Sequence, residues 1–282
     1  MSIISHGQGC LPSAGRNFAV ARTRRRDKLA LVIPTLCEAE NIRLLLERAC
    51  RVLDPLEIDY EVLVVDDDSC DGTAEIVEAI AHRDPRIRLL VRREQRGLSG
   101  ALLHGWAHTD AAIVGVIDAD LQHPPELLAE LTAAMFSGCD LAIASRYAAG
   151  GRQCGWDPIR RLVSAAAILA TWPIQRNGLR AVDPLSGFFL VRRDCLLGIP
   201  FQQSGFKLLL EILVRARISS VREVPFAFGR RYRGSSKANV KVALEYGRLL
   251  ARLYRSRLAS RRTILSAGPI ESAGAYGNPK LL

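Results

Sequence analysis

Residues 112–122 read Ala-Ile-Val-Gly-Val-Ile-Asp-Ala-Asp-Leu-Gln, an apolar run that ends abruptly in two carboxylates one residue apart. A short, continuous apolar run is typical of a strand that is buried on both faces of a parallel sheet. Side chains alternate along a strand, so we expect Asp118 and Asp120 to point the same way. They follow the carboxyl end of the strand, the edge at which open α/β sheets bind ligands.

The residue types in this stretch favour a hard divalent cation. Asp118, Asp120 and Gln122 offer carboxylate and carbonyl oxygens, which Mg²⁺ and Mn²⁺ prefer. An ion held by only two or three protein oxygens keeps coordination positions for a diphosphate. The simpler interpretation is a strand end followed by an acidic loop, and the Asp-x-Asp pair alone does not exclude it.

A regular alternation of strand and helix patterns surrounds this stretch. The apolar, β-branched runs that predict strands lie at 29–33, 61–66, 87–91, 112–117 and 140–144. The helical patterns between them lie near 40–52, 73–82, 98–108 and 125–136. This repetition predicts an α/β fold with a doubly wound, mostly parallel central sheet, Rossmann-like, with helices on both faces.

The second half of the chain is less regular. Its expected elements are a flexible loop at 150–155, helices near 160–174 and 206–217, and strands at 186–191 and 221–226. A basic amphipathic helix is predicted over 238–258. We therefore expect a basic disordered tail over 1–27, one folded domain over 28–237, a basic helix over 238–262 and a flexible tail over 263–282.

Charge and composition narrow the partners. The 282 residues carry a net charge of +10, concentrated at the two ends of the chain. This distribution suggests an anionic membrane surface or nucleic acid, but no nucleic-acid-binding motif is present. No apolar run is long enough to span a membrane. Seven scattered cysteines without a Cys-x-x-Cys pair indicate reduced thiols in the cytoplasm.

Two further strands are followed by polar clusters, Pro34-Thr-Leu-Cys-Glu38 and Asp66-Asp-Asp-Ser-Cys-Asp-Gly-Thr73. Together with Asp118 and Asp120 they form one cleft at the same sheet edge. The sequence has neither a Gly-x-Gly-x-x-Gly dinucleotide motif nor a Walker A loop. We therefore expect a cation at Asp118 and Asp120 to bind the phosphates of a nucleotide.

These motifs, taken in order, resemble inverting GT-A glycosyltransferases of family 2, and more narrowly dolichol- or polyprenol-phosphate mannosyltransferases. The resemblance runs from about Leu29 to Tyr246. Besides the clusters above, it rests on Gly97-Leu-Ser-Gly-Ala, Asp118-Ala-Asp-Leu-Gln-His-Pro-Pro-Glu, Ser145-Arg-Tyr, Gly155-Trp with Arg160 and Ser164, Asp183-Pro-Leu-Ser-Gly-Phe-Phe, Gly205-Phe-Lys-Leu-Leu-Leu-Glu and Arg231-x-x-Gly-x-Ser-Lys237. The family usually has an aromatic–Asn pair where Leu36 and Cys37 stand.

The resemblance implies a GT-A catalytic domain and a role for each matched residue. Nucleoside or donor contacts are implied for Pro34, Thr35, Glu38 and Asp66. Asp118, Asp120 and Gln122 would hold Mg²⁺ or Mn²⁺ and, through it, the donor diphosphate. The implied ligands of the acceptor phosphate are Arg146, Arg160, Arg231 and Lys237. Asp118, Asp120 and Arg146 are the implied catalytic residues.

The implied reaction is transfer of mannose from GDP-mannose to a dolichyl or polyprenyl phosphate, by in-line attack with inversion (a β-mannosyltransferase). A phosphate monoester is already anionic near neutral pH, so the acceptor needs cationic residues and no general base. The alternatives are a polyprenyl-phosphate glucosyltransferase or another transferase with a UDP donor, and a catalytically silent subunit or binding module. We expect a peripheral protein at the cytosolic face of a membrane, bound through the segments near 160–174 and 238–258, with no nucleic acid partner. The sequence identifies no protein partner.

Overall fold

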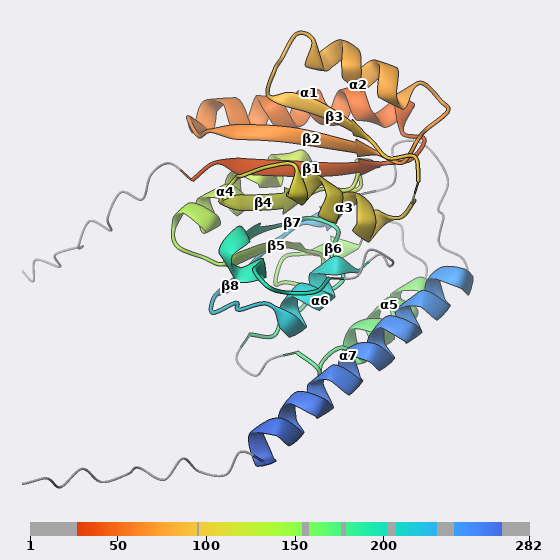
Figure 1. The fold of residues 1–282 in the computed structure, drawn as a ribbon, viewed down its shortest axis with the longest axis vertical. Coiled ribbons are helices and arrows are strands. Elements are labelled where there is room, and N and C mark those ends of the chain that lie inside the picture. The colour runs from red at the N-terminus through yellow and green to blue at the C-terminus, as the bar shows by residue number, and fades with distance from the viewer. Residues whose placement is uncertain are drawn as a thin grey trace, which may run out of the picture.

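The computed structural model describes residues 27–94, 96–153, 158–175, 179–201, 207–229 and 240–266. Within these residues seven strands form a central sheet in the order β3-β2-β1-β4-β7-β5-β8 (Figure 1). The strands are β1 (Leu29–Thr35), β2 (Tyr60–Asp66), β3 (Ile87–Val91), β4 (Ile113–Val116), β5 (Leu141–Ser145), β7 (Phe189–Arg192) and β8 (Val221–Pro225). All seven lie at or close to the ranges that the apolar runs predict.

The sheet is mostly parallel, as expected. Strand β1 is parallel to β2 and β4, β2 is parallel to β3, and β5 is parallel to β8. The exception is β7, which runs antiparallel to both of its neighbours, β4 and β5. A small separate sheet pairs β6 (Arg152–Gln153) with β9 (Ala227–Phe228), neither of which the sequence pattern predicts.

Helices cover both faces of the sheet, which confirms the doubly wound α/β arrangement (Figure 1). The helices are α1 (Ala39–Leu53), α2 (Thr73–Ala81), α3 (Leu98–Ala107), α4 (Leu128–Phe136), α5 (Pro158–Leu169), α6 (Leu208–Arg215) and α7 (Val240–Ser266). Short 3₁₀ turns occur at Asp54–Leu56, Pro125–Leu127 and Arg193–Leu196. Helices α1, α2 and α4 pack on one face, and α3 and α6 on the other.

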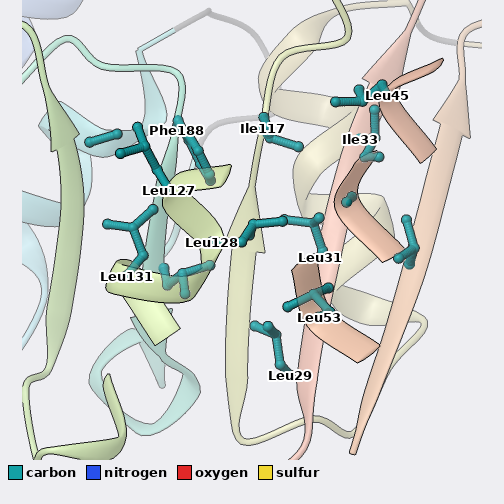
Figure 2. Packing of buried hydrophobic residues seen from close by; sticks show 14 of the residues in the cluster. Leu29, Leu31, Ile33, Leu45, Leu53, Ile117, Leu127, Leu128, Leu131 and Phe188 are labelled. Carbon is teal, nitrogen blue, oxygen red and sulfur yellow. The ribbon is translucent and has the colours of Figure 1, made fainter. Parts of the chain in front are cut away.

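Strand β1 shows how the sequence builds this two-sided core. Leu29, Leu31 and Ile33 belong to the cluster under α1 and α4, whereas Ala30 and Val32 belong to the cluster under α3. Figure 2 shows the first cluster, in which side chains of β1 lie between those of α1 and α4. Because both faces are covered, β1 is apolar throughout, and only its carboxyl end carries polar groups.

Helices α5 and α7 lie side by side away from the sheet (Figure 1). Leu249 and Leu253 of α7 are buried in a third cluster, to which α5 and α6 also contribute. The hydroxyls of Tyr246 and Tyr254 donate to the carbonyl oxygens of Ala167 (2.6 Å) and Ala170 (2.8 Å). These bonds satisfy carbonyls at the carboxyl end of α5, where the helix itself supplies no donors.

The predicted helices differ from the described ones mainly at their ends. The expected 160–174 helix is α5, which ends at Leu169, and the expected 238–258 helix is α7, which continues to Ser266. The predicted tails fall largely on residues 1–26 and 267–282, which lie outside the described residues. In the part of the chain that the structure describes, no helix has both the length and the apolar character needed to cross a membrane.

Candidate active site at the carboxyl edge of the sheet

The carboxyl ends of β1 and β2 are joined by a buried hydrogen bond. Thr35 and Asp66 are neighbours in the register of the two strands, and the Thr35 hydroxyl donates to Asp66 Oδ1 at 2.7 Å. Asp66 also accepts from the backbone N–H and the hydroxyl of Ser69, at 2.8 and 2.7 Å. Its carboxylate is fully buried, so it organises the loop after β2.

The loop after β1 is fastened to the loop after β2. Glu38 N–H donates to the Thr73 hydroxyl at 3.0 Å, and Ala39 N–H donates to Asp71 Oδ2 at 3.0 Å. The Asn41 side chain donates to the Glu38 carboxylate at 2.7 Å. Pro34, four residues before Glu38, is partly exposed. The structure thus brings Pro34, Thr35, Glu38 and Asp66 to one edge, where the sequence predicts the nucleoside site.

Asp67 is a second buried carboxylate at this edge, and it binds a third segment, the loop before α3. Its Oδ2 accepts from Gly97 N–H at 2.6 Å, and its Oδ1 lies 3.0 Å from the guanidinium of Arg92. Burial raises the pKa of Asp67, although the bond to Gly97 and the charge of Arg92 oppose this shift. The loop before α3 is therefore held against the loop after β2.

Strand β4 delivers the Asp118–Gln122 segment to the same edge. The Asp118 side chain is 32% exposed, whereas Asp120 is buried. Gln122 N–H donates to Asp120 Oδ1 at 3.1 Å, and the Gln122 Nε2 donates to Gly229 O at 3.3 Å. That last bond uses the amide nitrogen, so Oε1 is the atom of Gln122 with the character of a metal ligand.

Leu121 turns the chain between two of these candidate ligands. Its φ of 59° lies in the left-handed region, which is a strained conformation for a bulky residue. Strain of this kind persists where the surrounding structure requires it, and it is concentrated at functional sites.

His123 lies next to this segment and is neutral. Its ring packs against Phe188, Phe226 and Phe228. Burial lowers the pKa of His123 to about 3, and the charges of Arg146 and Lys207 add to the effect. The 3.7 Å approach of His123 Nδ1 to Asp118 Oδ2 is therefore not an ion pair at neutral pH.

Arg146 is held by a buried carboxylate. Its Nε and Nη2 donate to the two oxygens of Asp183 at 2.8 and 2.7 Å, and its backbone N–H adds a third bond at 2.9 Å. Burial alone would lower the pKa of Arg146, but the bonds to Asp183 outweigh it and raise the pKa. Asp118 also contributes to that rise, so the guanidinium lies within electrostatic reach of the candidate metal ligands.

Lys207, which immediately precedes α6, is a cation that the sequence analysis did not select. Its ammonium donates to Leu185 O at 3.0 Å. Burial lowers the pKa of Lys207 to about 8, and repulsion from Arg146 contributes, while Asp118 and Asp183 oppose the shift. Lys207 and Arg146 are thus two positive charges beside Asp118. The Gly205-Phe-Lys motif was the available signal, but from the sequence it indicated only the family resemblance and a helix near 206–217.

The other predicted phosphate ligands are placed less fully. Arg160 is on α5, and Tyr147, the residue after Arg146, donates to Ser164 one turn further along the helix at 2.7 Å. Arg146 and α5 are therefore neighbours. Arg231 and Lys237 lie outside the described residues, but Gly229, just before them, is hydrogen-bonded to Gln122.

The oxygen ligands of Asp118, Asp120 and Gln122 suit a divalent ion that keeps some coordination positions for other groups. Within the described residues, no group of three or more His, Cys, Asp or Glu side chains is arranged to hold a metal. Two carboxylates with one amide oxygen match the ligands that Mg²⁺ and Mn²⁺ accept, and leave positions for phosphate oxygens. Arg146 and Lys207, both within electrostatic reach of Asp118, supply positive charge that could bind a second anionic group.

Comparisons with known proteins agree with the family that the sequence motifs resemble. Residues 30–209 match the family model described as glycosyl transferase family 2. The dolichol-phosphate mannosyltransferase of Pyrococcus furiosus is 40% identical over 227 residues, which are 80% of this chain and 63% of that protein. This chain therefore spans less than two thirds of that relative. The dolichol-phosphate mannosyltransferase of Saccharomyces cerevisiae is 33% identical over 84% of this chain and 90% of its own length.

Solved structures share the fold at lower identity. Mannosyl-3-phosphoglycerate synthase from Rubrobacter xylanophilus has a TM-score of 0.63 at 20% identity, over 82% of this chain and 75% of its own. Glucosyl-3-phosphoglycerate synthase from Mycobacterium tuberculosis, in complex with Mn²⁺, UDP-glucose and glycerol 3-phosphate, has a TM-score of 0.57 at 23% identity, over 82% and 80%. These likenesses show a common GT-A fold.

Proposed function

Because the chain belongs to glycosyltransferase family 2, and within it to the dolichol-phosphate mannosyltransferases, we propose that it transfers mannose from GDP-mannose to a dolichyl or polyprenyl phosphate. The product is a β-linked polyprenyl-phosphate mannose, formed with inversion. One observation carries the proposal: Asp118, in the Asp118–Gln122 segment that follows β4, lies within electrostatic reach of the cations of Arg146 and Lys207.

In this mechanism Asp118, Asp120 and Gln122 would hold a divalent ion, Mg²⁺ or Mn²⁺. When bound, the ion would supply positive charge to the donor diphosphate and to the departing nucleoside diphosphate. Pro34, Thr35, Glu38 and Asp66, at and just after the carboxyl ends of β1 and β2, would orient the nucleoside.

The lipid phosphate supplies the nucleophile. One of its anionic oxygens attacks the anomeric carbon, a carbon–oxygen bond forms, and the bond to the diphosphate breaks on the opposite face. Arginine and lysine bind phosphate through charge-assisted hydrogen bonds, so Arg146, Arg160, Arg231 and Lys237 are assigned to this anion, Arg146 through the guanidinium hydrogens that Asp183 does not take. Lys207 adds positive charge near Arg146.

A product assay tests the function. The protein is mixed with Mg²⁺ or Mn²⁺, a short polyprenyl phosphate and equal amounts of GDP-mannose, UDP-glucose and UDP-N-acetylglucosamine, and lipids are analysed by mass spectrometry. A hexosyl-phosphoryl lipid formed with release of GDP alone is the expected result. Release of UDP would replace the donor, and the absence of any lipid product from folded protein would refute the transferase assignment to a lipid acceptor.

We further propose that α5 docks on an anionic membrane at its cytosolic face. Ile159, Leu162, Val163 and Leu169 of α5 are 75%, 72%, 62% and 53% exposed, and Trp172, just after the helix, is 45% exposed. The spacing of the four helix residues is that of one helix face. The exposed Arg248 and Arg255 of α7 supply positive charge for lipid headgroups beside it.

Liposome pelleting measures this contact. Leu162→Ser combined with Val163→Ser should reduce the fraction that pellets with phosphatidylserine liposomes, because it removes apolar surface from the bilayer contact. Leu197→Ser is the control. Leu197 is 63% exposed and follows the 3₁₀ turn Arg193–Leu196, so the substitution removes exposed apolar surface that is not on α5. Equal pelleting of the wild type and the double variant would contradict the proposal.

A further inference from the structure

Hydrogen bonds hold the segment that precedes β7, residues 182–187, against the rest of the protein, and we call it the braced segment. Val182 and Asp183 donate their backbone N–H groups to the two carboxylate oxygens of Glu223 on β8, at 2.7 and 3.0 Å. The Asp183 carboxylate in turn holds Arg146 through the bidentate pair. A buried pair of this kind fixes both partners, because separating them leaves an uncompensated charge.

The far end of the segment is pinned as well. Ser186 donates its hydroxyl to Ala144 O on β5 at 2.7 Å and accepts from Phe188 N–H at 3.2 Å. Lys207 binds Leu185 O. Because groups from β5, from β8 and from the residue before α6 bind the segment, its backbone has little freedom to move.

Gly187 is the residue of this braced segment that faces the candidate metal site. A Cβ atom placed on Gly187 would lie 2.7 Å from Asp118 Cγ and 2.9 Å from its Oδ1, and closer still to Oδ2. These separations are shorter than real Cβ contacts allow. The backbone of Gly187 is not in the left-handed region, so what the glycine supplies is space, and a methyl group there would displace the Asp118 carboxylate.

We infer that Gly187 is a positioning residue for the reaction. The absence of a side chain lets the Asp118 carboxylate lie directly against the start of β7, and the braced segment fixes the place that the carboxylate occupies. The inference rests on the proposed function in one respect, the assignment of Asp118 as a metal ligand. Groups that orient metal ligands without binding the metal typically change metal affinity about 10- to 100-fold when they are altered.

Binding of Mn²⁺ in the presence of GDP, followed by electron paramagnetic resonance, tests this role. Gly187→Ala should weaken Mn²⁺ binding about tenfold or more, whereas Gly247→Ala on α7 should bind as the wild type does. A Cβ at Gly247 meets nothing within 4 Å, so this control adds the same methyl group in open space. Wild-type affinity in Gly187→Ala would overturn the inference alone, while wild-type protein that binds no Mn²⁺ would overturn the proposed metal site as well.

Thermal unfolding tests the same contact without any metal. Gly187→Ala should lower Tm in the wild-type background and have a smaller effect in the Asp118→Ala background, where the clashing carboxylate is gone. This cycle isolates the coupling between the two positions. If Gly187→Ala alone does not fold, the double variant should recover folded protein. An equal loss of Tm in both backgrounds, or failure of both variants to fold, would overturn the inference.

Discussion

Three residues at the ligand edge hold a backbone conformation that L-amino acids rarely adopt. Cys37, Asp68 and Leu121 have φ values of 58°, 58° and 59°, and they follow β1, β2 and β4 respectively. Strands that end abruptly must turn within a residue or two if their polar groups are to face one cleft. The left-handed residues make those turns, at a cost of roughly 1–3 kcal/mol each.

Cys37 provides a direct measure of that cost. Asparagine is tolerated better than cysteine in the left-handed region, because its short polar side chain bonds locally to the backbone. Cys37→Asn should therefore raise the free energy of unfolding by up to about 1 kcal/mol. Chemical denaturation measures it, with Cys70→Asn as the control, since Cys70 is equally exposed but is not left-handed. A gain as large in the control would show that the substitution acts through something other than backbone strain.

Lys207 is predicted to contribute charge to the reaction. Its ammonium lies within electrostatic reach of Asp118 and Arg146 and so opposes the negative charge that builds up on the departing diphosphate. Lys207→Met should lower kcat about 100-fold or more with an unchanged fold, and Lys207→Arg should retain more activity because it keeps the charge. Steady-state kinetics of the two variants provide the test, and a kcat of Lys207→Met equal to that of the wild type would exclude the role.

At the residue scale, the sequence predicted which strand ends carry polar groups but not how those groups bond. Asp118, Asp120 and Gln122 follow an apolar strand, and that local pattern was enough to place them after β4, while their role as metal ligands stays a prediction. The pairing of Arg146 with Asp183 joins residues 37 positions apart, so no local signal announces it. Likewise, nothing next to His123 in the sequence indicates that three phenylalanines from two other segments bury it.

At the scale of elements, the sequence pattern predicted strand β7 but not its direction. An apolar run predicts a strand, but its direction depends on which neighbours it joins. Strand β7 enters between β4 and β5 in the opposite direction, and the residues before it cross the ligand edge as the braced segment. The antiparallel strand thus explains why Gly187 lies against Asp118.

A second feature is a hydrogen-bonded cluster around Asp54, at the start of β2 and thus at the opposite sheet edge from the site. The Tyr60 hydroxyl donates to Asp54 Oδ1 at 2.6 Å, and Arg86 binds both Asp54 and Asp84. The bond from Tyr60 is the main cause of the lowered pKa of Asp54. A lowered pKa means that the stabilisation is fully present above the ordinary pKa of aspartate and is lost as pH falls through the lowered value.

Tyr60→Phe should therefore destabilise the protein by about 0.5–1 kcal/mol near pH 7, a figure reduced for the exposure of Asp54. The difference from the wild type should shrink as the pH falls from the ordinary pKa of aspartate, about 3.9, through the lowered pKa of Asp54. Urea unfolding of both proteins at pH 7 and pH 3 measures the effect. A difference that grows towards acid pH would contradict the assigned direction of the pKa shift.

At the scale of the whole molecule, the chain combines a rigid α/β body with the α5–α7 pair beside its ligand edge. Tyr147 links the Arg146 loop to α5, and Tyr246 and Tyr254 link α5 to α7. A phosphate group carried on a lipid bound near α5 would thus be close to Arg146. The exposed apolar residues of α5 thus lie on the helix that is bonded to the loop carrying Arg146.

The central claim is that the Asp118–Gln122 segment holds the donor through a divalent ion, and calorimetry of GDP-mannose binding tests it most directly. The wild type should bind GDP-mannose in the presence of Mn²⁺ and much more weakly once the metal is chelated. Asp120→Ala should keep its circular dichroism spectrum and lose the metal-dependent part of the affinity. Unchanged Mn²⁺-dependent affinity in folded Asp120→Ala would contradict the account.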